Sequence, residues 1–598
     1  MASTFGFTLH DWQRCYQQDP HQVYALLEAH LADLTHNDTA WITLATPDQL
    51  RAQIEPLLIR YLRHPDDLPL FGVPFAVKDN IDVAGWPTTA ACPAFTYIAQ
   101  QDAFAVARLK AAGAIVIGKT NLDQYATGLV GTRSPWGAVP NTFHPDYVSG
   151  GSSSGSASVL ARGLVAFALG TDTAGSGRVP AAFNNIVGLK PTKGWLSTCG
   201  VVPACRLNDT LSVFALTVED AFTVACTAGG YDDSDPYARV NPMTAPASLQ
   251  AQPRFAIPAN PPFFDDTLAE AAWARALQAL EECGATLHPI DFTPFHQLAG
   301  QLYYGPWVAE RTAAVGEMLD RPEEMDPVVH SIIASGRNYS AVDAYRAEYL
   351  RAELSRQIQQ SLAPFDALVV PTSPTIHTLE EIKQEPVRYN SQFGTYTNFT
   401  NLADLAALAL PAPFRADGLP AGITFIAPAW HDRALASFAL RWQQQMALPS
   451  GATGKKRPAQ PRPLPPSDAH VRVAVVGAHL SGMPLNFQLT TRDAVLVEQT
   501  QTASHYRLYA LPDGPIKKPG LMRAESGRAI QVELWDIPLA RFGEFVAEIP
   551  PPLGIGNLTL TDGRLVKGFI CEAAALNNAL EITEFGGWRN WLASQESN

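Results

Sequence analysis

The sequence predicts an α/β protein in which a mixed β-sheet is sandwiched by helices and a smaller β-rich domain follows. Apolar strand-like runs at 73–77 and 114–118 flank an amphipathic helix-like segment at 103–112. Such alternation is typical of layered α/β cores. Beyond a proline-rich stretch at 451–467, strand-like runs such as 471–476 replace the helical patterns. The change of pattern indicates a second domain of a different class.

We expect the main domain to span residues 1–450, with a helical segment at 1–64 that shows apolar positions at helical spacing. Residues 451–467 contain five prolines and four basic residues, which predicts an extended interdomain linker. The second domain would then cover 468–598. Within it, Asp562-Gly563 between two strand-like runs predicts a two-residue hairpin turn.

The amino-acid composition argues against several classes of function. The 598-residue chain is 46% hydrophobic and 17% charged, with a formal net charge of −14, which argues against nucleic acid or an anionic membrane as a partner. Its seven scattered cysteines form no C-x-x-C pair, so we expect reduced thiols in a cytoplasmic location and no structural zinc. We expect no other metal and no cofactor. No signal peptide or membrane span is expected, because no basic-then-apolar leader and no long apolar run occurs.

The stretch 147–182 organises the main domain. It holds a Gly/Ser loop with Ser152, a short apolar segment expected to form a buried helix and then a strand, and a second small-residue loop with Ser176. A third motif lies upstream, where the apolar run 73–77 ends at Lys78. Loops beyond strand ends are where α/β folds place their chemistry, so these three side chains are expected to meet.

These three motifs resemble the amidase signature family, serine hydrolases of carboxamides, over roughly residues 65–430. The resemblance implies a Ser-cisSer-Lys triad: Ser176 is the nucleophile, Ser152 relays its proton, and Lys78 is the general base. It also implies that backbone N–H groups form the oxyanion hole, those of Thr173, Ala174, Gly175 and Ser176. Arg178 resembles the family's structural arginine, which braces this loop.

Lys78 must be uncharged to act as a base, although a free lysine has a pKa of about 10.4. Its apolar context favours a lowered pKa through burial, whereas the adjacent Asp79 opposes it. The alternative is a solvated strand-end lysine without a catalytic role. Lys119 is a rival base, but the resemblance places the base at Lys78. Gly177 stands where many members carry a β-branched residue, which suggests room for a polar substrate.

Three further features resemble allophanate hydrolases within this family. They are the pocket-like loop 121–128, which ends at Gly128, the segment 303–311, and the appended C-terminal domain. The resemblance implies a small anionic substrate, allophanate, with Gly128, Tyr303 and Arg311 in contact with it. It also implies a homodimer and a functional link to urea carboxylase.

Physical reasoning on segment 303–311 leaves two interpretations of Arg311. Pro306 suits the first turn of a helix, which would place Arg311 in the second turn and Tyr303 just before the helix. A guanidinium can grip a planar carboxylate in bidentate fashion. The alternative is that Arg311 pairs with Glu310 or Glu317 on a solvated face.

The C-terminal domain resembles the γ-glutamylcyclotransferase-type domain of longer allophanate hydrolases, to which that family assigns the decarboxylation of N-carboxycarbamate. Loop 477–486 follows a strand-like run and combines Gly, His and Asn, so it is the candidate site. His479 could donate a proton during loss of carbon dioxide. A hydrogen-bonded structural histidine is the alternative.

Two other functions stay open at this stage. The first is a generic amidase or the glutamine-hydrolysing subunit of an amidotransferase, which the same family contains. The second is a non-catalytic scaffold that binds urea carboxylase through its tail; the intact Lys78, Ser152 and Ser176 argue against it.

Overall fold

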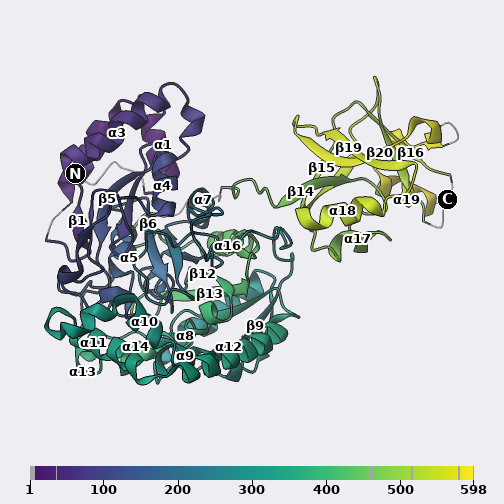
Figure 1. Cartoon of the computed structure of the whole chain (residues 1–598). Coiled ribbons are helices and arrows are strands. Elements are labelled where there is room, and N and C mark those ends of the chain that lie inside the picture. The colour runs from purple at the N-terminus through teal and green to yellow at the C-terminus, as the bar shows by residue number, and fades with distance from the viewer. Residues whose placement is uncertain (1–6, 35–36, 457–461, 513–515, 577–578, 597–598) are drawn as a thin grey trace. The chain divides into compact units, whose positions relative to one another are not determined.

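A computed structural model of the chain describes residues 7–34, 37–456, 462–512, 516–576 and 579–596. The chain forms two compact units (Figure 1). The first unit contains residues 1–240 and 251–465, and the second contains 241–250 and 466–598. The ten residues 241–250 therefore leave the first unit and pack with the second, which the sequence pattern did not indicate. Residues 457–461 of the expected linker lie outside the described residues.

An eleven-stranded sheet forms the centre of the first unit. Its strands are β1 (Trp41–Leu44), β2 (Pro74–Lys78), β5 (Ile115–Thr120), β6 (Phe167–Asp172), β7 (Val187–Lys190), β8 (Thr210–Ala215), β9 (Arg254–Pro258), β10 (Thr286–Ile290), β11 (Ala367–Pro371), β12 (Leu405–Ala412) and β13 (Ala421–Pro428). Their order is β1-β5-β2-β6-β8-β7-β12-β13-β11-β9-β10. Strand β2 runs parallel to β5 and β6, whereas β6 and β8 are antiparallel, so the sheet is mixed, as predicted.

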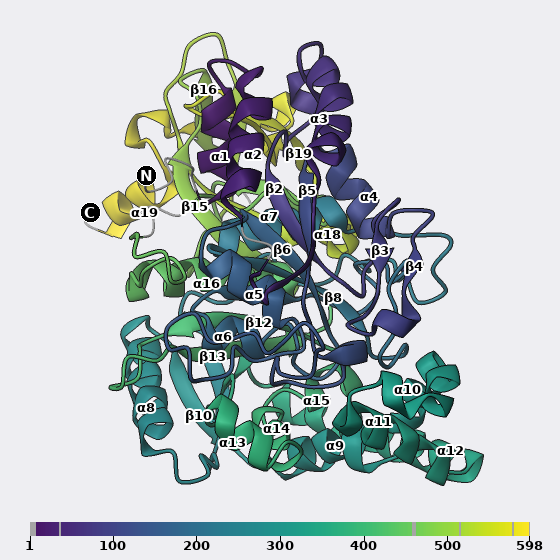
Figure 2. The same ribbon diagram turned by 90° about the vertical axis from the view of Figure 1, so that its left-hand side faces the viewer.

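Helices cover both faces of this sheet (Figures 1 and 2). The helices of this unit beyond the N-terminal segment are α4 (Phe104–Ala111), α5 (Ser154–Ala161), α6 (Val179–Phe183), α7 (Val218–Ala228), α8 (Thr267–Glu282), α9 (Thr293–Tyr304), α10 (Val308–Val315), α11 (Pro327–Ala334), α12 (Ala341–Leu362), α13 (Leu379–Gln384), α14 (Arg388–Phe393), α15 (Phe399–Leu402) and α16 (Asp432–Met446). On β13, Phe425 packs against Phe438 and Trp442 of α16. Its neighbour Ile426 points to the other face and joins a core with Leu354 of α12. The alternation places helices on opposite faces, which confirms the predicted sandwich.

The N-terminal segment contains helices α1 (Leu9–Tyr16), α2 (Gln22–Asp33) and α3 (Pro47–Tyr61), but it is not helical throughout. Strand β1 lies between α2 and α3 and pairs antiparallel with β5 at the edge of the main sheet. The prediction of helices alone is therefore wrong at 41–44. A four-residue strand is recognisable mainly by its partner, and the residues of β5 that pair with it lie 74 to 79 positions later in the chain.

The second unit is rich in β-structure. Its strands are β14 (His470–Val475), β15 (Val495–Gln501), β16 (Tyr506–Ala510), β17 (Pro519–Arg523), β18 (Gln531–Pro538), β19 (Leu553–Thr559), β20 (Leu565–Cys571) and β21 (Leu580–Glu581), in sheets ordered β15-β18-β14-β20-β19 and β17-β16-β21. Helices α17 (Phe487–Thr490), α18 (Leu539–Ala547) and α19 (Trp588–Glu596) accompany them. The predicted hairpin joins β19 and β20, but Leu560 N–H bonds Arg564 O and Gly563 is left-handed (φ 87°), so the loop has three residues rather than two.

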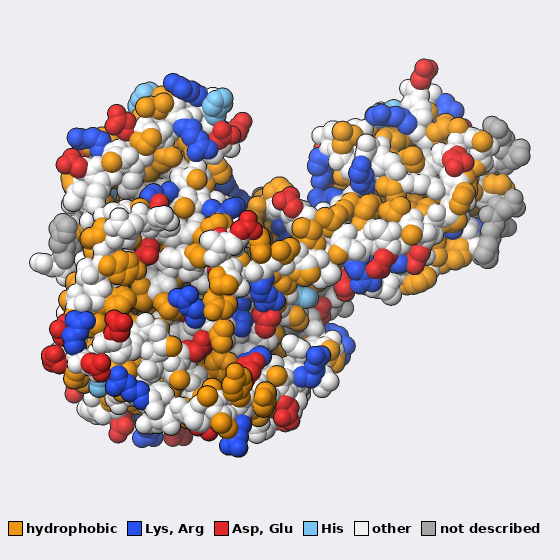
Figure 3. Space-filling view, viewed as in Figure 1, with side chains coloured by type: hydrophobic (Ala, Val, Ile, Leu, Met, Phe, Trp, Pro, Cys, Tyr) orange, Lys and Arg blue, Asp and Glu red, His pale blue; other side chains and the backbone are white. Residues whose placement is uncertain are grey.

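The visible surface of the first unit carries interspersed acidic and basic side chains rather than one charged patch (Figure 3). Among the described residues, no helix has both the length and the apolar character that crossing a membrane requires.

Candidate active site

Lys78 is the last residue of β2, between the parallel strands β5 and β6, and its side chain is 0% exposed. Its Nζ donates hydrogen bonds to Ser152 Oγ at 2.8 Å, Ser153 Oγ at 3.0 Å and Thr171 Oγ1 at 2.7 Å. Three hydroxyl groups thus surround the amine, and among the described residues no carboxylate forms an ion pair with it. The structure brings Lys78 and Ser152 together, as the sequence predicts.

Burial lowers the pKa of Lys78 to about 7, although the charges of Asp123, Asp172 and Asp209 raise it in part. The adjacent Asp79, expected to oppose this shift, instead pairs with Lys119 at 3.1 Å in a buried ion pair. The rival lysine is therefore held by a carboxylate, whereas a substantial fraction of Lys78 is uncharged near neutral pH. This arrangement supports Lys78 as the base.

Ser152 lies in the Gly/Ser loop that leads into α5, and the Gly151–Ser152 peptide bond is cis. The loop is packed against Asp123, because a Cβ on Gly151 would come within 2.2 Å of Asp123 Oδ2. The Asp123 carboxylate accepts backbone N–H groups from four consecutive residues at 3.0–3.1 Å: Val130, Gly131, Thr132 and Arg133. One buried carboxylate therefore organises the loop that faces Ser152.

Ser176 lies in the loop after β6 and is 3% exposed. Within the described part of the chain, the N–H groups of Thr173, Ala174, Gly175 and Ser176 donate to no residue. Buried N–H groups without acceptors are rare in folded proteins. Successive N–H groups in a tight loop form an anion site, which supports the proposed oxyanion hole.

No hydrogen bond between the hydroxyl groups of Ser176 and Ser152 occurs among the described residues. The relay between these two serines therefore stays a prediction.

Arg178 braces the Ser176 loop. Its Nε and Nη2 donate to the two oxygens of Asp172 at 2.9 Å each, and its Nη1 donates to Thr400 Oγ1 at 2.8 Å. Burial alone would raise the pKa of Asp172, but the charge and hydrogen bonds of Arg178 lower it. Gly177 does not provide room for a substrate, contrary to expectation: its Cβ would lie 2.6 Å from Ser212 Cβ.

Arg311 is 1% exposed and forms no ion pair with a carboxylate of the described residues. Its Nη1 donates to Thr127 Oγ1 at 2.8 Å, its Nη2 to the Tyr303 hydroxyl at 3.4 Å, and its Cζ lies 5.3 Å from the Tyr303 ring centre. Its Nε is buried without a hydrogen-bond partner among them. The predicted alternative, pairing with Glu310 or Glu317, is not observed.

The helix that carries Arg311 begins later in the chain than predicted, at Val308 rather than near Pro306. Helix α10 begins at Val308, so Arg311 lies in its first turn, while Tyr303 belongs to the last turn of the preceding helix α9. Residues 305–307 separate the two helices. The sequence pattern suggested a single helix start, and the kink between the helices brings Tyr303 and Arg311 into contact.

Gly128 follows Thr127, whose hydroxyl accepts from Arg311. A Cβ at this position would lie 2.6 Å from Asp123 Oδ2, so only glycine fits here. Sequence reasoning missed Ser153, Thr171 and Asp123 as parts of the site. Ser153 adjoins a predicted residue, but the bond of Thr171 to Lys78 spans 93 residues, and no local pattern indicates it.

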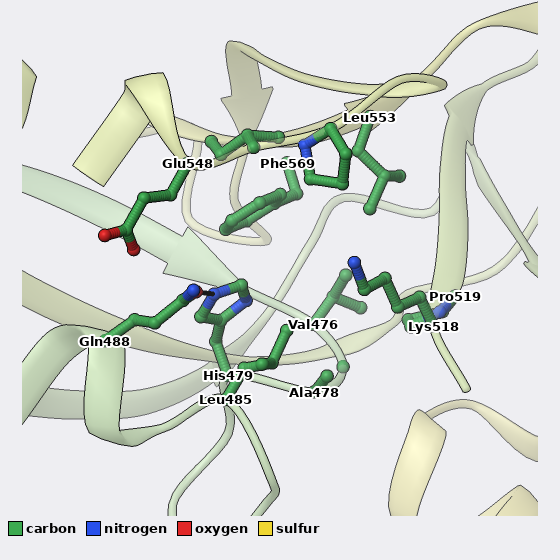
Figure 4. Close-up of a pocket in the computed structure, with 13 residues that line it drawn as sticks. Val476, Ala478, His479, Leu485, Gln488, Lys518, Pro519, Glu548, Leu553 and Phe569 are labelled. Carbon is green, nitrogen blue, oxygen red and sulfur yellow. Dashed lines mark hydrogen bonds between the residues drawn. The ribbon is translucent and has the colours of Figure 1, made fainter. Parts of the chain in front are cut away.

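In the second unit, His479 lies in the loop after β14 and is 9% exposed. Its Nε2 is 2.7 Å from Gln488 Oε1, and its ring stacks on Phe569 with 4.9 Å between ring centres. Burial lowers the pKa of His479. The residue lines a cavity (Figure 4), so the predicted candidate stands beside a space that can hold a ligand.

Comparison with known proteins identifies the family to which the chain belongs. Residues 25–436 match the family model described as Amidase, and residues 471–593 match the Allophanate hydrolase C-terminal domain. The chain therefore belongs to the amidase family and is an amidohydrolase. The more specific likeness is to allophanate hydrolase: the structure of the Kluyveromyces lactis enzyme is 44% identical, has a TM-score of 0.88, and matches over 99% of this chain and 100% of that one.

Two curated relatives are longer proteins. The chain is 44% identical to the urea amidolyase of Saccharomyces cerevisiae and 45% identical to that of Lachancea kluyveri, over 98% and 99% of its own length. It spans about a third of the length of these relatives, 33% in each case. The predicted resemblance to the amidase signature family and to allophanate hydrolases is confirmed.

Proposed function

We propose that this chain is an allophanate hydrolase that releases ammonia from the terminal carboxamide of allophanate. The observation that carries the proposal is Arg311, a buried cation without a carboxylate partner in the described part of the chain. An unpaired buried charge is costly, so the site favours a substrate that brings a negative charge. Allophanate is a small planar anion whose carboxylate matches a guanidinium.

The arrangement supports acyl transfer through Ser176. Uncharged Lys78 withdraws the proton of Ser152, which takes that of Ser176, and Ser176 Oγ attacks the carboxamide carbon. The four N–H groups of residues 173–176, which have no acceptor in the described part of the chain, stabilise the oxyanion. The protonated Lys78 returns its proton through Ser152 to the leaving nitrogen, ammonia departs, and water releases N-carboxycarbamate from the acyl-enzyme. Loss of carbon dioxide in the second unit, with His479 as proton donor, then leads to ammonia and carbon dioxide.

Replacing Arg311 by leucine should reduce kcat/KM for allophanate about 100-fold, because a charge-assisted bidentate contact is lost. Biuret is the matched control substrate, since it carries a carboxamide where allophanate carries its carboxylate. For biuret the loss should stay below about threefold. Ammonia release from both substrates at equal enzyme concentration measures the ratio. Equal losses of kcat/KM for the two substrates would show that Arg311 does not recognise the carboxylate.

The alternative of a glutamine-hydrolysing amidotransferase subunit is not favoured. A relative of that description, from Symbiobacterium thermophilum, is 35% identical but matches only 63% of this chain. Wild-type protein should hydrolyse allophanate far faster than glutamine; the reverse preference would replace the proposal.

We further propose that the chain acts as a homodimer in the cytoplasm and uses allophanate made by a urea carboxylase. The support is the resemblance to allophanate hydrolases and the presence of this region within longer urea amidolyases. One chain has a mass of 64.6 kDa. Light scattering should therefore give about twice this mass, and the mass of a single chain would contradict the dimer.

A further inference from the structure

The cavity beside His479 has a volume of about 120 Å³ (Figure 4). This volume is well below the roughly 300–1,000 Å³ of pockets that bind drug-sized ligands, so the cavity suits a small occupant. Apolar side chains form most of its wall, among them Val476, Leu485, Leu553 and Phe569.

His479 presents one defined edge to this cavity. Because an amide oxygen only accepts hydrogen bonds, the contact with Gln488 Oε1 places the hydrogen of the neutral ring on Nε2. The opposite edge, which carries Nδ1, faces the cavity on the side of Lys518 (Figure 4). Gln488 and Phe569 hold the ring in this orientation.

Lys518 extends into the cavity opposite His479 (Figure 4). Within the described ranges, its ammonium forms neither an ion pair nor a side-chain hydrogen bond. The acid on the wall, Glu548, is held by Arg492 Nη2 at 2.6 Å, which offsets its charge. Lys518 is therefore a cation available to a ligand.

We propose that Lys518 binds one carboxylate of a small dicarboxylate in this cavity, while His479 protonates the nitrogen between its two carboxyl groups. The inference rests on the proposed function, which supplies N-carboxycarbamate as that dianion. In the step, the bond between the nitrogen and one carboxyl carbon breaks and its electron pair stays on nitrogen. The nitrogen takes a proton from His479, carbon dioxide leaves, and carbamate remains.

The distribution of charge in the cavity selects which carboxyl group leaves. The carboxylate on Lys518 is stabilised as an anion, whereas the other faces apolar side chains and loses hydration. Its departure as neutral carbon dioxide relieves that cost. The dianion also favours protonation of His479 by its proximity, so binding of the substrate prepares the proton that the reaction consumes. Gln488 acts as a positioning residue because it orients the imidazole.

Full-length protein supplied with ¹³C-labelled allophanate tests this inference, because NMR separates formation of N-carboxycarbamate from its loss. Lys518→Met should slow the enzyme-dependent loss of N-carboxycarbamate about 10- to 100-fold and leave its formation unchanged. Lys518→Arg, which retains the charge, should restore most of the rate. Lys517→Met is the matched control, since Lys517 instead lies 5.9 Å from the Trp591 ring centre and should have no effect.

The His479→Ala variant distinguishes an error in the role of Lys518 from an error in the proposed function. If it slows the second step and Lys518→Met does not, the role of Lys518 is wrong and the proposed function stands. If neither His479→Ala nor Lys518→Met alters the loss of N-carboxycarbamate, the assignment of the second step to this unit fails. A rate for Lys518→Arg as low as that for Lys518→Met would also overturn carboxylate binding by charge.

Discussion

Replacing Ser176 by alanine should reduce ammonia release from allophanate by about 10⁴- to 10⁶-fold, the range seen when a serine hydrolase loses its nucleophile. Ser176, which carries the hydroxyl group, is the last of four consecutive residues, 173–176, whose N–H groups have no acceptor among the described residues. These groups cannot compensate, because they stabilise an oxyanion that forms only after attack. The variant should fold as the wild type does, since Ser176 Oγ donates to no described residue.

Ser158→Ala is the matched control for this variant. Ser158 is a buried serine of α5, 3% exposed, and lies outside the hydroxyl cluster around Lys78. Its replacement should change the rate by less than about threefold. A fluorophosphonate probe should label wild type and Ser158→Ala but not Ser176→Ala. Labelling of Ser176→Ala, or ammonia release close to that of wild type, would assign the nucleophile to another residue.

The sequence predicts much of the fold because its signals are local. Buried strands ending in polar residues, and helices with apolar stripes, are recognisable within ten to twenty residues. Strand β1 is different, since its four residues gain their hydrogen bonds from β5. Residues 241–250 are different as well, because their packing with the second unit depends on distant partners. Elements that are defined by tertiary pairing escape local patterns.

Some residues of the candidate site are likewise recognisable from local sequence, and others are not. The motifs identify Lys78, Ser152 and Ser176, because their small and apolar neighbours mark loops at strand ends. The role of Arg311 depends on the lack of a carboxylate partner for its guanidinium among the described residues. A sequence cannot show that a neighbouring acid such as Glu310 points elsewhere. Glu310 in fact accepts the N–H of Leu207 at 3.1 Å. Contacts of this kind require coordinates.

Replacing Lys78 by methionine should reduce ammonia release about 10³- to 10⁴-fold, because the only buried amine in contact with Ser152 among the described residues is lost. Arginine at this position should fail equally, since a guanidinium does not give up its proton in this pH range. Lys190 provides the control. Its pKa is also lowered to about 7 by burial, but its Nζ donates to Pro191 O. Lys190→Met should therefore keep activity within about threefold.

The pH dependence follows from the lowered pKa of Lys78, about 7 in the folded protein. Only the uncharged amine is a base, so kcat/KM should rise as pH increases through about 7 and then level off. The free energy of unfolding should also rise with pH. Between about pH 7 and pH 10.4, Lys78 binds a proton in the unfolded chain but not in the folded protein, so wild type gains stability as pH increases. Lys78→Met should lose this pH-dependent gain, and Lys190→Met should lose a similar one without losing activity. If Lys78→Met unfolds with the same pH dependence as wild type, the amine is charged in the folded protein and cannot be the base.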